Sequence, residues 1–161
     1  MIIINATRIN QGGGKTLLLD LIDSLIDQEY LLMLDSRFKD EIFKKNIKVF
    51  KFKSTFLGIL QSELFIKKIS KKNDKILFFN NLPPLFNING QKIIFLQNKL
   101  IISSSSLKYY NFKTKIRLFI ERFWFAFRAN KKMKIIVQSY SMKVLLKRNL
   151  FLDSQVIPFL K

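Results

Sequence analysis

The chain has 161 residues, 48% of them apolar, which is enough to build one domain around a hydrophobic core. It contains neither cysteine nor histidine, so disulfides, thiolate metal sites, cysteine nucleophiles and a Ser-His-Asp triad are excluded. The formal net charge of +18 favours an anionic partner, either phosphate, nucleic acid or an anionic membrane, although an AT-rich genome would also enrich the chain in lysine.

Short apolar runs alternate with amphipathic stretches along the whole chain. The apolar runs predict strands, and apolar residues at helical spacing predict helices. In chain order we expect a strand at 2–4, a helix at 16–28, strands at 31–34 and 47–52, a helix at 56–70, strands at 75–79 and 92–96, a helix at 113–129, a strand at 134–137, a helix at 142–148 and a strand at 156–158. This alternation predicts a single α/β domain over 1–161, Rossmann-like and doubly wound, with a mostly parallel sheet.

A glycine-rich loop joins the first predicted strand to the first predicted helix. Glycines let the backbone approach a ligand closely, and a helix N-terminus offers free N–H groups to a phosphate. The predicted phosphate-binding residues are Gly12, Gly13, Gly14, Lys15 and Thr16. A P-loop also needs a glycine six residues before Lys15, where this chain has Ile9. A P-loop-like nucleotide-binding protein and a tight turn without a ligand are therefore the alternatives here.

Amide and hydroxyl side chains follow three predicted strands at their carboxyl ends. These residues are Asn80, Asn81, Gln97, Asn98, Gln138 and Ser139. Ligands of doubly wound sheets bind at this edge, and neutral hydrogen-bonding groups suit sugar hydroxyls. The same side chains can instead cap strand-to-loop turns.

Five segments together resemble the N-terminal domain of bacterial family-4-type glycosyltransferases with the GT-B fold. In chain order they are INATRINQGGGKTLLLDLI at 4–22, NNLPPLF at 80–86, IIFLQNKLII at 93–102, KIIVQSYSMKVLL at 134–146 and VIPF at 156–159. The resemblance implies transfer of a sugar from a nucleotide-sugar to a cell-surface polysaccharide or lipid-linked acceptor, with no metal or other cofactor. It also implies that this domain binds the acceptor and that the C-terminal donor-binding domain is absent from this chain, so that a separate chain carrying that domain is a candidate partner.

The resemblance also suggests roles by position. Gly12, Gly13 and Gly14 would face the donor diphosphate, and the amides at the strand ends would line the acceptor cleft. The glutamates of this chain lack the E-x7-E spacing of the family's donor-binding domain, and no histidine stands where one often acts in the family. The expectation is therefore a glycosyltransferase or its acceptor-binding half, with no catalytic residue assigned. A non-enzymatic binding module that needs a partner chain is the alternative.

The stretch KIRLFIERFWFAFRA at 115–129 is an aromatic and basic helix. Ile116, Ile120, Phe123 and Phe127 form one stripe, which we expect to face the core. Apolar residues left among arginines suit a membrane interface. The predicted membrane-facing residues are Arg117, Leu118, Arg122, Trp124, Phe125 and Arg128. A helix buried on two sides, or one docked on the missing domain, are the alternatives.

The sequence also predicts a location. No stretch reaches the roughly 18–20 apolar residues that span a bilayer, and MIIIN does not resemble a signal peptide. We therefore expect a cytoplasmic protein, peripheral at the inner face of the cell membrane. Nucleic acid is not an expected partner, because the chain has no RNP-type aromatic motif, zinc-finger spacing or basic tail.

Overall fold

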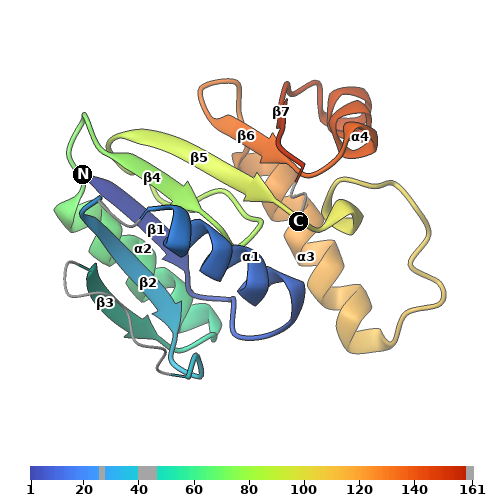
Figure 1. Cartoon of the computed structure of the whole chain (residues 1–161). Coiled ribbons are helices and arrows are strands. Elements are labelled where there is room, and N and C mark those ends of the chain that lie inside the picture. The colour runs from blue at the N-terminus through green and yellow to red at the C-terminus, as the bar shows by residue number, and fades with distance from the viewer. Residues whose placement is uncertain (26–27, 40–46, 159–161) are drawn as a thin grey trace.

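The computed structural model describes residues 1–25, 28–39 and 47–158. Its centre is a seven-stranded sheet in the order β3-β2-β1-β4-β5-β6-β7, and every neighbouring pair of strands is parallel (Figure 1). The strands are β1 (Ile2–Ala6), β2 (Tyr30–Asp35), β3 (Ile47–Phe52), β4 (Lys75–Phe78), β5 (Gln91–Leu96), β6 (Lys134–Val137) and β7 (Gln155–Val156). The helices are α1 (Gly12–Ser24), α2 (Phe56–Ile69), α3 (Phe112–Arg128), α4 (Tyr140–Leu150) and the short 3-10 helix η1 (Lys99–Ile101).

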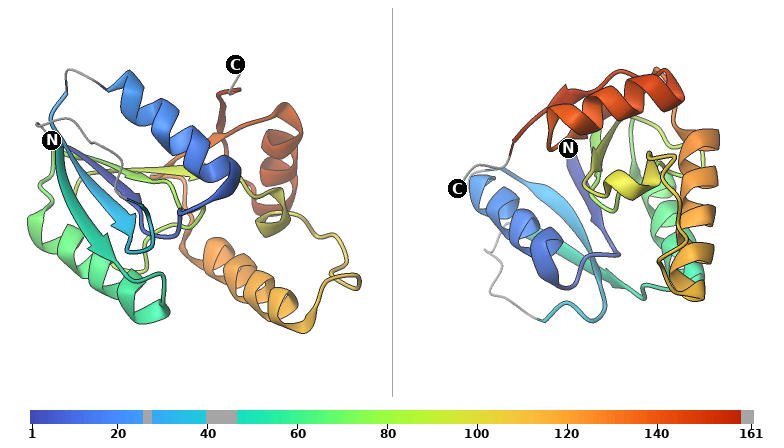
Figure 2. Two further views of the ribbon diagram at one scale, coloured as in Figure 1. Left: turned by 60° about the horizontal axis from the view of Figure 1, so that its bottom comes forward. Right: turned by 90° about the vertical axis from the view of Figure 1, so that its right-hand side faces the viewer.

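Helices cover both faces of this sheet. Helix α1 lies on one face, whereas α2 and α3 lie side by side on the other (Figure 2). Successive strand residues point to opposite faces, so Ile4 packs in the cluster of α1 with Leu18, while Ile3 packs in the cluster of α2 with Ile66. A third cluster joins β5 and β6 to α3, η1 and α4. The central strands β1 and β2 are thus buried between two helical layers and form continuous apolar runs, whereas the edge strand β3 is only partly buried and alternates with lysines.

The predicted α/β class with a Rossmann-like parallel sheet is confirmed, whereas its assignment to the N-terminal half of a GT-B fold stays a prediction. The largest shift in a boundary concerns the first helix, which begins at Gly12 rather than Thr16. Glycine is a poor helix former, so its propensity argued for a loop. Here Gly12 enters the helix with φ +68°, and the next two glycines complete its first turn. Of the segment at 156–159, Phe159 lies outside the described residues.

The predicted orientation of α3 is wrong. The stripe expected in the core is exposed to solvent: Ile116 by 45%, Phe123 by 68% and Phe127 by 75%. Two residues expected to face a membrane, Leu118 and Phe125, are completely buried. Trp124, expected to face a membrane as well, is also buried and donates from Nε1 to the carbonyl oxygen of Pro83 at 2.8 Å.

Of the three arginines predicted to face a membrane, two are engaged in hydrogen bonds and one is exposed. Arg122 donates to the carbonyl oxygens of Leu100 and Ser105, and Arg128 donates to that of Pro84. Both therefore hold neighbouring loops. Arg117 is the member of the predicted set that is exposed and makes no hydrogen bond or ion pair among the described residues.

The reversal of α3 has a physical cause in Glu121. This glutamate lies in the middle of the face that carries Leu118, Trp124 and Phe125, and a charge at that position argues against burial. In the structure Glu121 is buried, and its carboxylate is ion-paired with Arg8 from the loop after β1. An ion-pair partner that is distant in the sequence therefore allows this face of α3 to be buried. Among the described residues, no helix is both long enough and apolar enough to cross a bilayer.

Candidate functional site

The candidate site lies where the chain changes direction across the sheet. Strand β1 connects to β2 on one side, whereas β4 connects to β5 on the other, and β1 and β4 are neighbours. The loops that follow these two strands therefore diverge at their carboxyl ends. In open parallel sheets this switch point is the usual position of a ligand.

A small polar pocket of about 160 Å³ occupies this position. Its walls come from the loop after β1, the loops after β4 and β5, and the inner side of α3. The lining residues are Arg8, Ile9, Asn80, Asn81, Asn98, Ile101, Arg117 and Glu121. The structure thus brings together three of the six amides and hydroxyls predicted to form an acceptor cleft.

Asn81 and Asn98 each have a structural role on one side of the amide. The Oδ1 atom of Asn81, at φ 69°, accepts from the backbone N–H of Gln97 at 2.6 Å and of Asn98 at 2.9 Å. The Oδ1 atom of Asn98 caps η1 by accepting from the N–H of Leu100 at 3.0 Å. Their carbonyl oxygens are therefore engaged, which leaves the amide NH₂ groups as the donors that can face the pocket.

Asn80, which lines this pocket, and Asn5, near the end of β1, carry unsatisfied polar atoms. Asn80 is 5% exposed, and its Oδ1 atom has no hydrogen-bond partner among the described residues. Asn5, at the end of β1, accepts from Thr7 through Oδ1, but its Nδ2 is likewise unpartnered. A buried polar group without a partner costs about 1–3 kcal/mol, so a ligand atom that paired with either group would be favoured at this edge.

The pocket carries a positive charge that is not fully compensated. Among the described residues Glu121 is the only carboxylate that lines it, and that carboxylate is paired with Arg8. Arg117 adds a second guanidinium, exposed on α3. A ligand with one or two negative charges would therefore be attracted to this end of the sheet.

An apolar cleft of about 410 Å³ adjoins the polar pocket. It runs between α2 and α3, and the two hollows share Arg8, Arg117 and Glu121. Its other lining residues are Ser54, Phe56, Ile59, Leu82, Lys113, Ile116, Ile120 and Trp124. The polar, charged pocket is therefore directly continuous with the apolar cleft.

The loop after β4 is clamped beside this cleft. The buried carboxylate of Glu63 accepts from the N–H groups of Leu85 at 2.7 Å and Phe86 at 3.3 Å. Burial raises the pKa of Glu63 to about 7, against the lowering effect of these two backbone hydrogen bonds and of Arg128. Because Trp124 and Arg128 hold the same loop from α3, the position of the cleft depends on both helices.

The predicted phosphate-binding residues lie at the start of α1 and line neither hollow. The preceding residue, Gln11, gives no side-chain cap to the helix, and a Cβ added at Gly12 or Gly13 would meet no atom within 4 Å. A Cβ at Gly14 would lie 3.4 Å from Oε1 of Gln97, so the glycine loop touches the end of β5. Lys15 lies with its Nζ 5.0 Å from the centre of the Phe38 ring, and Thr16 is exposed.

The remaining predicted cleft residues lie apart from the polar pocket. Gln97 donates from Nε2 to the carbonyl oxygen of Phe79 at 3.3 Å and so ties β5 to β4. Ser139 caps α4 by accepting from the N–H of Met142, and Gln138 precedes it at the end of β6. Ser139 therefore follows the alternative in which such residues cap turns.

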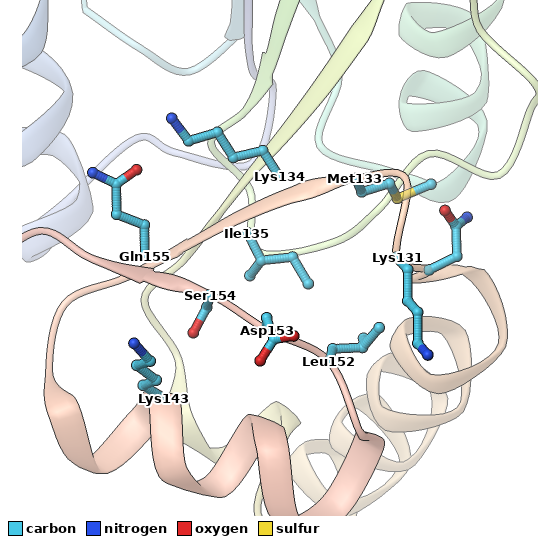
Figure 3. A pocket seen from close by; sticks show the side chains of 10 residues that line it. Lys131, Met133, Lys134, Ile135, Lys143, Leu152, Asp153, Ser154 and Gln155 are labelled. Atoms are coloured by element: carbon cyan, nitrogen blue, oxygen red, sulfur yellow. The ribbon is translucent and has the colours of Figure 1, made fainter.

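A further hollow of about 500 Å³ lies at the opposite, amino-terminal edge of β6 and β7. Lys131, Lys134 and Lys143 line it with Asp153 and Gln155 (Figure 3). The three ammonium groups lie around its rim and do not converge (Figure 3). Asp153 is also paired with Lys147 at 2.8 Å. The carboxyl edge, where polar groups share one pocket, is therefore the stronger site.

The sequence interpretation missed two residues that organise the site, Arg8 and Glu121. Arg8 follows a buried strand almost directly, and Glu121 is the only acid between Asp74 and Asp153. Those two signals together would have suggested the pair. Among the described residues, no group of three histidine, cysteine or acidic side chains could hold a metal ion.

No protein-family model matches the chain, and the comparisons with curated proteins and with solved structures gave no significant match.

Proposed function

We propose that this chain is the acceptor-binding domain of a GT-B glycosyltransferase, which transfers a sugar from a nucleotide-sugar to a lipid-linked glycan at the inner face of the cell membrane. The observation that carries the proposal is the direct junction of the polar pocket with the apolar cleft through Arg8, Arg117 and Glu121. A lipid-linked sugar has the matching order of parts: hydroxyl groups, a negatively charged phosphate link and an apolar chain.

Each part of such an acceptor has a counterpart in the site. The sugar hydroxyls accept hydrogen bonds from the NH₂ groups of Asn81 and Asn98 and donate to the unpartnered Oδ1 of Asn80. The phosphate link lies against the guanidinium of Arg117, with Arg8 behind it. The first units of the lipid chain follow the apolar wall of the cleft between α2 and α3.

The donor nucleotide-sugar enters from the side of α1. The uncapped first turn of that helix offers N–H groups to a diphosphate, and Gly12 and Gly13 leave room for it to approach. A donor-binding domain, in the same or a separate chain, supplies the remaining contacts. Glu121 is ion-paired with Arg8 in this structure, and no residue is assigned as the catalytic base.

The proposal can be tested through Trp124, which is the only tryptophan of the chain and lines the apolar cleft. A short-chain polyprenyl diphosphate that carries one sugar is titrated while the tryptophan emission is recorded. We expect a saturable change in emission, and Arg117→Gln should weaken binding about tenfold or more, because a hydrogen bond to a charged group contributes about 1.5–3 kcal/mol.

The matched control is Arg148→Gln, which removes the same charge from an exposed position on α4. It should leave binding unchanged. Equal losses in the two variants would mean that only net charge matters. An emission that stays constant throughout the titration would contradict the proposed acceptor.

A further inference from the structure

The outward face of α3 carries a continuous apolar stripe without a covering layer. Its members are Phe112, Ile116, Phe119, Ile120, Phe123 and Phe127, and each is between 45% and 76% exposed. At about 100° per residue, their side chains fall within an arc of roughly 100°. Monomeric soluble domains rarely expose so many large apolar side chains on one helix face.

Basic residues border this stripe, and acidic residues are sparse in the part of the sequence that surrounds it. Lys113 lies on one side and Lys115 on the other, and Lys108 precedes the helix. Between Asp74 and Asp153 the only acidic residue is Glu121, which is buried and paired with Arg8. The exposed surface around the described part of α3 is therefore apolar at its centre and positive at its margins.

We propose that this face of α3 is a docking surface for an anionic lipid bilayer. The aromatic side chains enter the boundary between headgroups and acyl chains, and the lysines contact lipid phosphates. Charge complementarity selects this partner, because a protein surface that covers the stripe would need its own acidic margin. The inference stands apart from the proposed reaction, since it rests on α3 alone.

This docking orients the rest of the molecule. Ile116 and Ile120 belong both to the stripe and to the wall of the apolar cleft. With the stripe in the bilayer surface, the cleft opens at the level of the lipid headgroups. An amphiphile can then reach the site without leaving the membrane.

The test is co-sedimentation of the full chain with vesicles of phosphatidylcholine alone or with about one third phosphatidylglycerol, at low salt and at about 0.5 M salt. We expect binding to the anionic vesicles, weakened but not abolished by salt, because salt screens the charges and leaves apolar insertion in place. Phe119→Ser with Phe123→Ser should reduce the high-salt binding at least tenfold. Lys113→Gln with Lys115→Gln should reduce low-salt binding about 25-fold, with each lysine contributing about fivefold.

Matched controls keep the result specific. Tyr140→Ser changes an aromatic residue that is 72% exposed on α4, and Lys68→Gln with Lys72→Gln removes two exposed charges at the far end of α2; both should bind like the unchanged chain. Circular dichroism shows whether each variant folds. If the unchanged chain fails to bind anionic vesicles at low salt, or if the phenylalanine variant binds equally well, the proposal is wrong. If the unchanged chain does not bind vesicles but forms a dimer, and the phenylalanine variant is a monomer, the partner of the stripe is a second copy of the chain instead.

Discussion

The guanidinium of Arg8 is ion-paired with the carboxylate of Glu121, which joins the loop after β1 to the buried face of α3. Both residues line the polar pocket and the apolar cleft. The pair therefore fixes the position of α3 relative to the sheet and defines the junction of the two hollows.

Breaking this pair from the arginine side should destabilise the fold. Arg8→Met leaves a buried carboxylate without its partner, and we expect a loss of about 3 kcal/mol in the free energy of unfolding. Adding Glu121→Gln to that variant removes the stranded charge and should recover part of the loss. Urea denaturation of both single variants and the double variant measures the coupling. Additive effects would show that the two charges do not interact.

The corrected orientation of α3 gives a second prediction. Trp124→Ala removes a buried side chain and should cost about 3–5 kcal/mol in the free energy of unfolding, whereas Phe123→Ala should cost less than about 1 kcal/mol. The two residues are adjacent in sequence, so each serves as the control for the other. Equal costs in thermal or urea unfolding would mean that the two faces of the helix are assigned incorrectly.

Glu63 predicts a pH dependence of stability. Its pKa is about 7 in the folded chain against an ordinary value of 4.5, so folding takes up a proton between these two values. The contribution of Glu63 is therefore most favourable below about pH 4.5, declines as the pH rises to about 7, and is constant above that. The full decline is at most about 3 kcal/mol.

Glu63→Gln isolates this effect from the other titrating groups. The amide oxygen of glutamine can still accept from Leu85 and Phe86, but it carries no proton to lose. The difference in stability between variant and unchanged chain should shift in favour of the variant between pH 5 and pH 7.5. A difference that does not vary with pH would contradict the raised pKa.

The fold could be predicted from the sequence because the central strands β1 and β2 are buried on both faces and therefore form continuous apolar runs. The strands around Ile4, Leu32 and Ile135 could be identified without knowing which strands lie beside them. The start of α1 was harder to predict, because Gly12 is both a turn residue with positive φ and the first residue of the helix.

The site could be predicted only in part. Asn80, Asn81 and Asn98 meet in the pocket because carboxyl ends of parallel strands share one edge. The buried face of α3 could not be predicted from the sequence, because its burial depends on an ion pair between residues 113 positions apart. Helical periodicity shows two apolar faces on α3. It does not show which of them is buried, because that depends on an ion pair with an arginine distant in the sequence.

The most direct test of the proposed acceptor site is a ¹H–¹⁵N NMR titration of the uniformly labelled chain with the sugar-bearing polyprenyl diphosphate. We expect the side-chain amide signals of Asn80, Asn81 and Asn98 to move together with the indole signal of Trp124. The same lipid without its sugar should move the indole signal and leave the amides nearly unchanged. Shifts confined to the lysine-lined hollow at the opposite edge, around Lys131 and Lys143, would show that the lipid-linked sugar does not bind in the polar pocket.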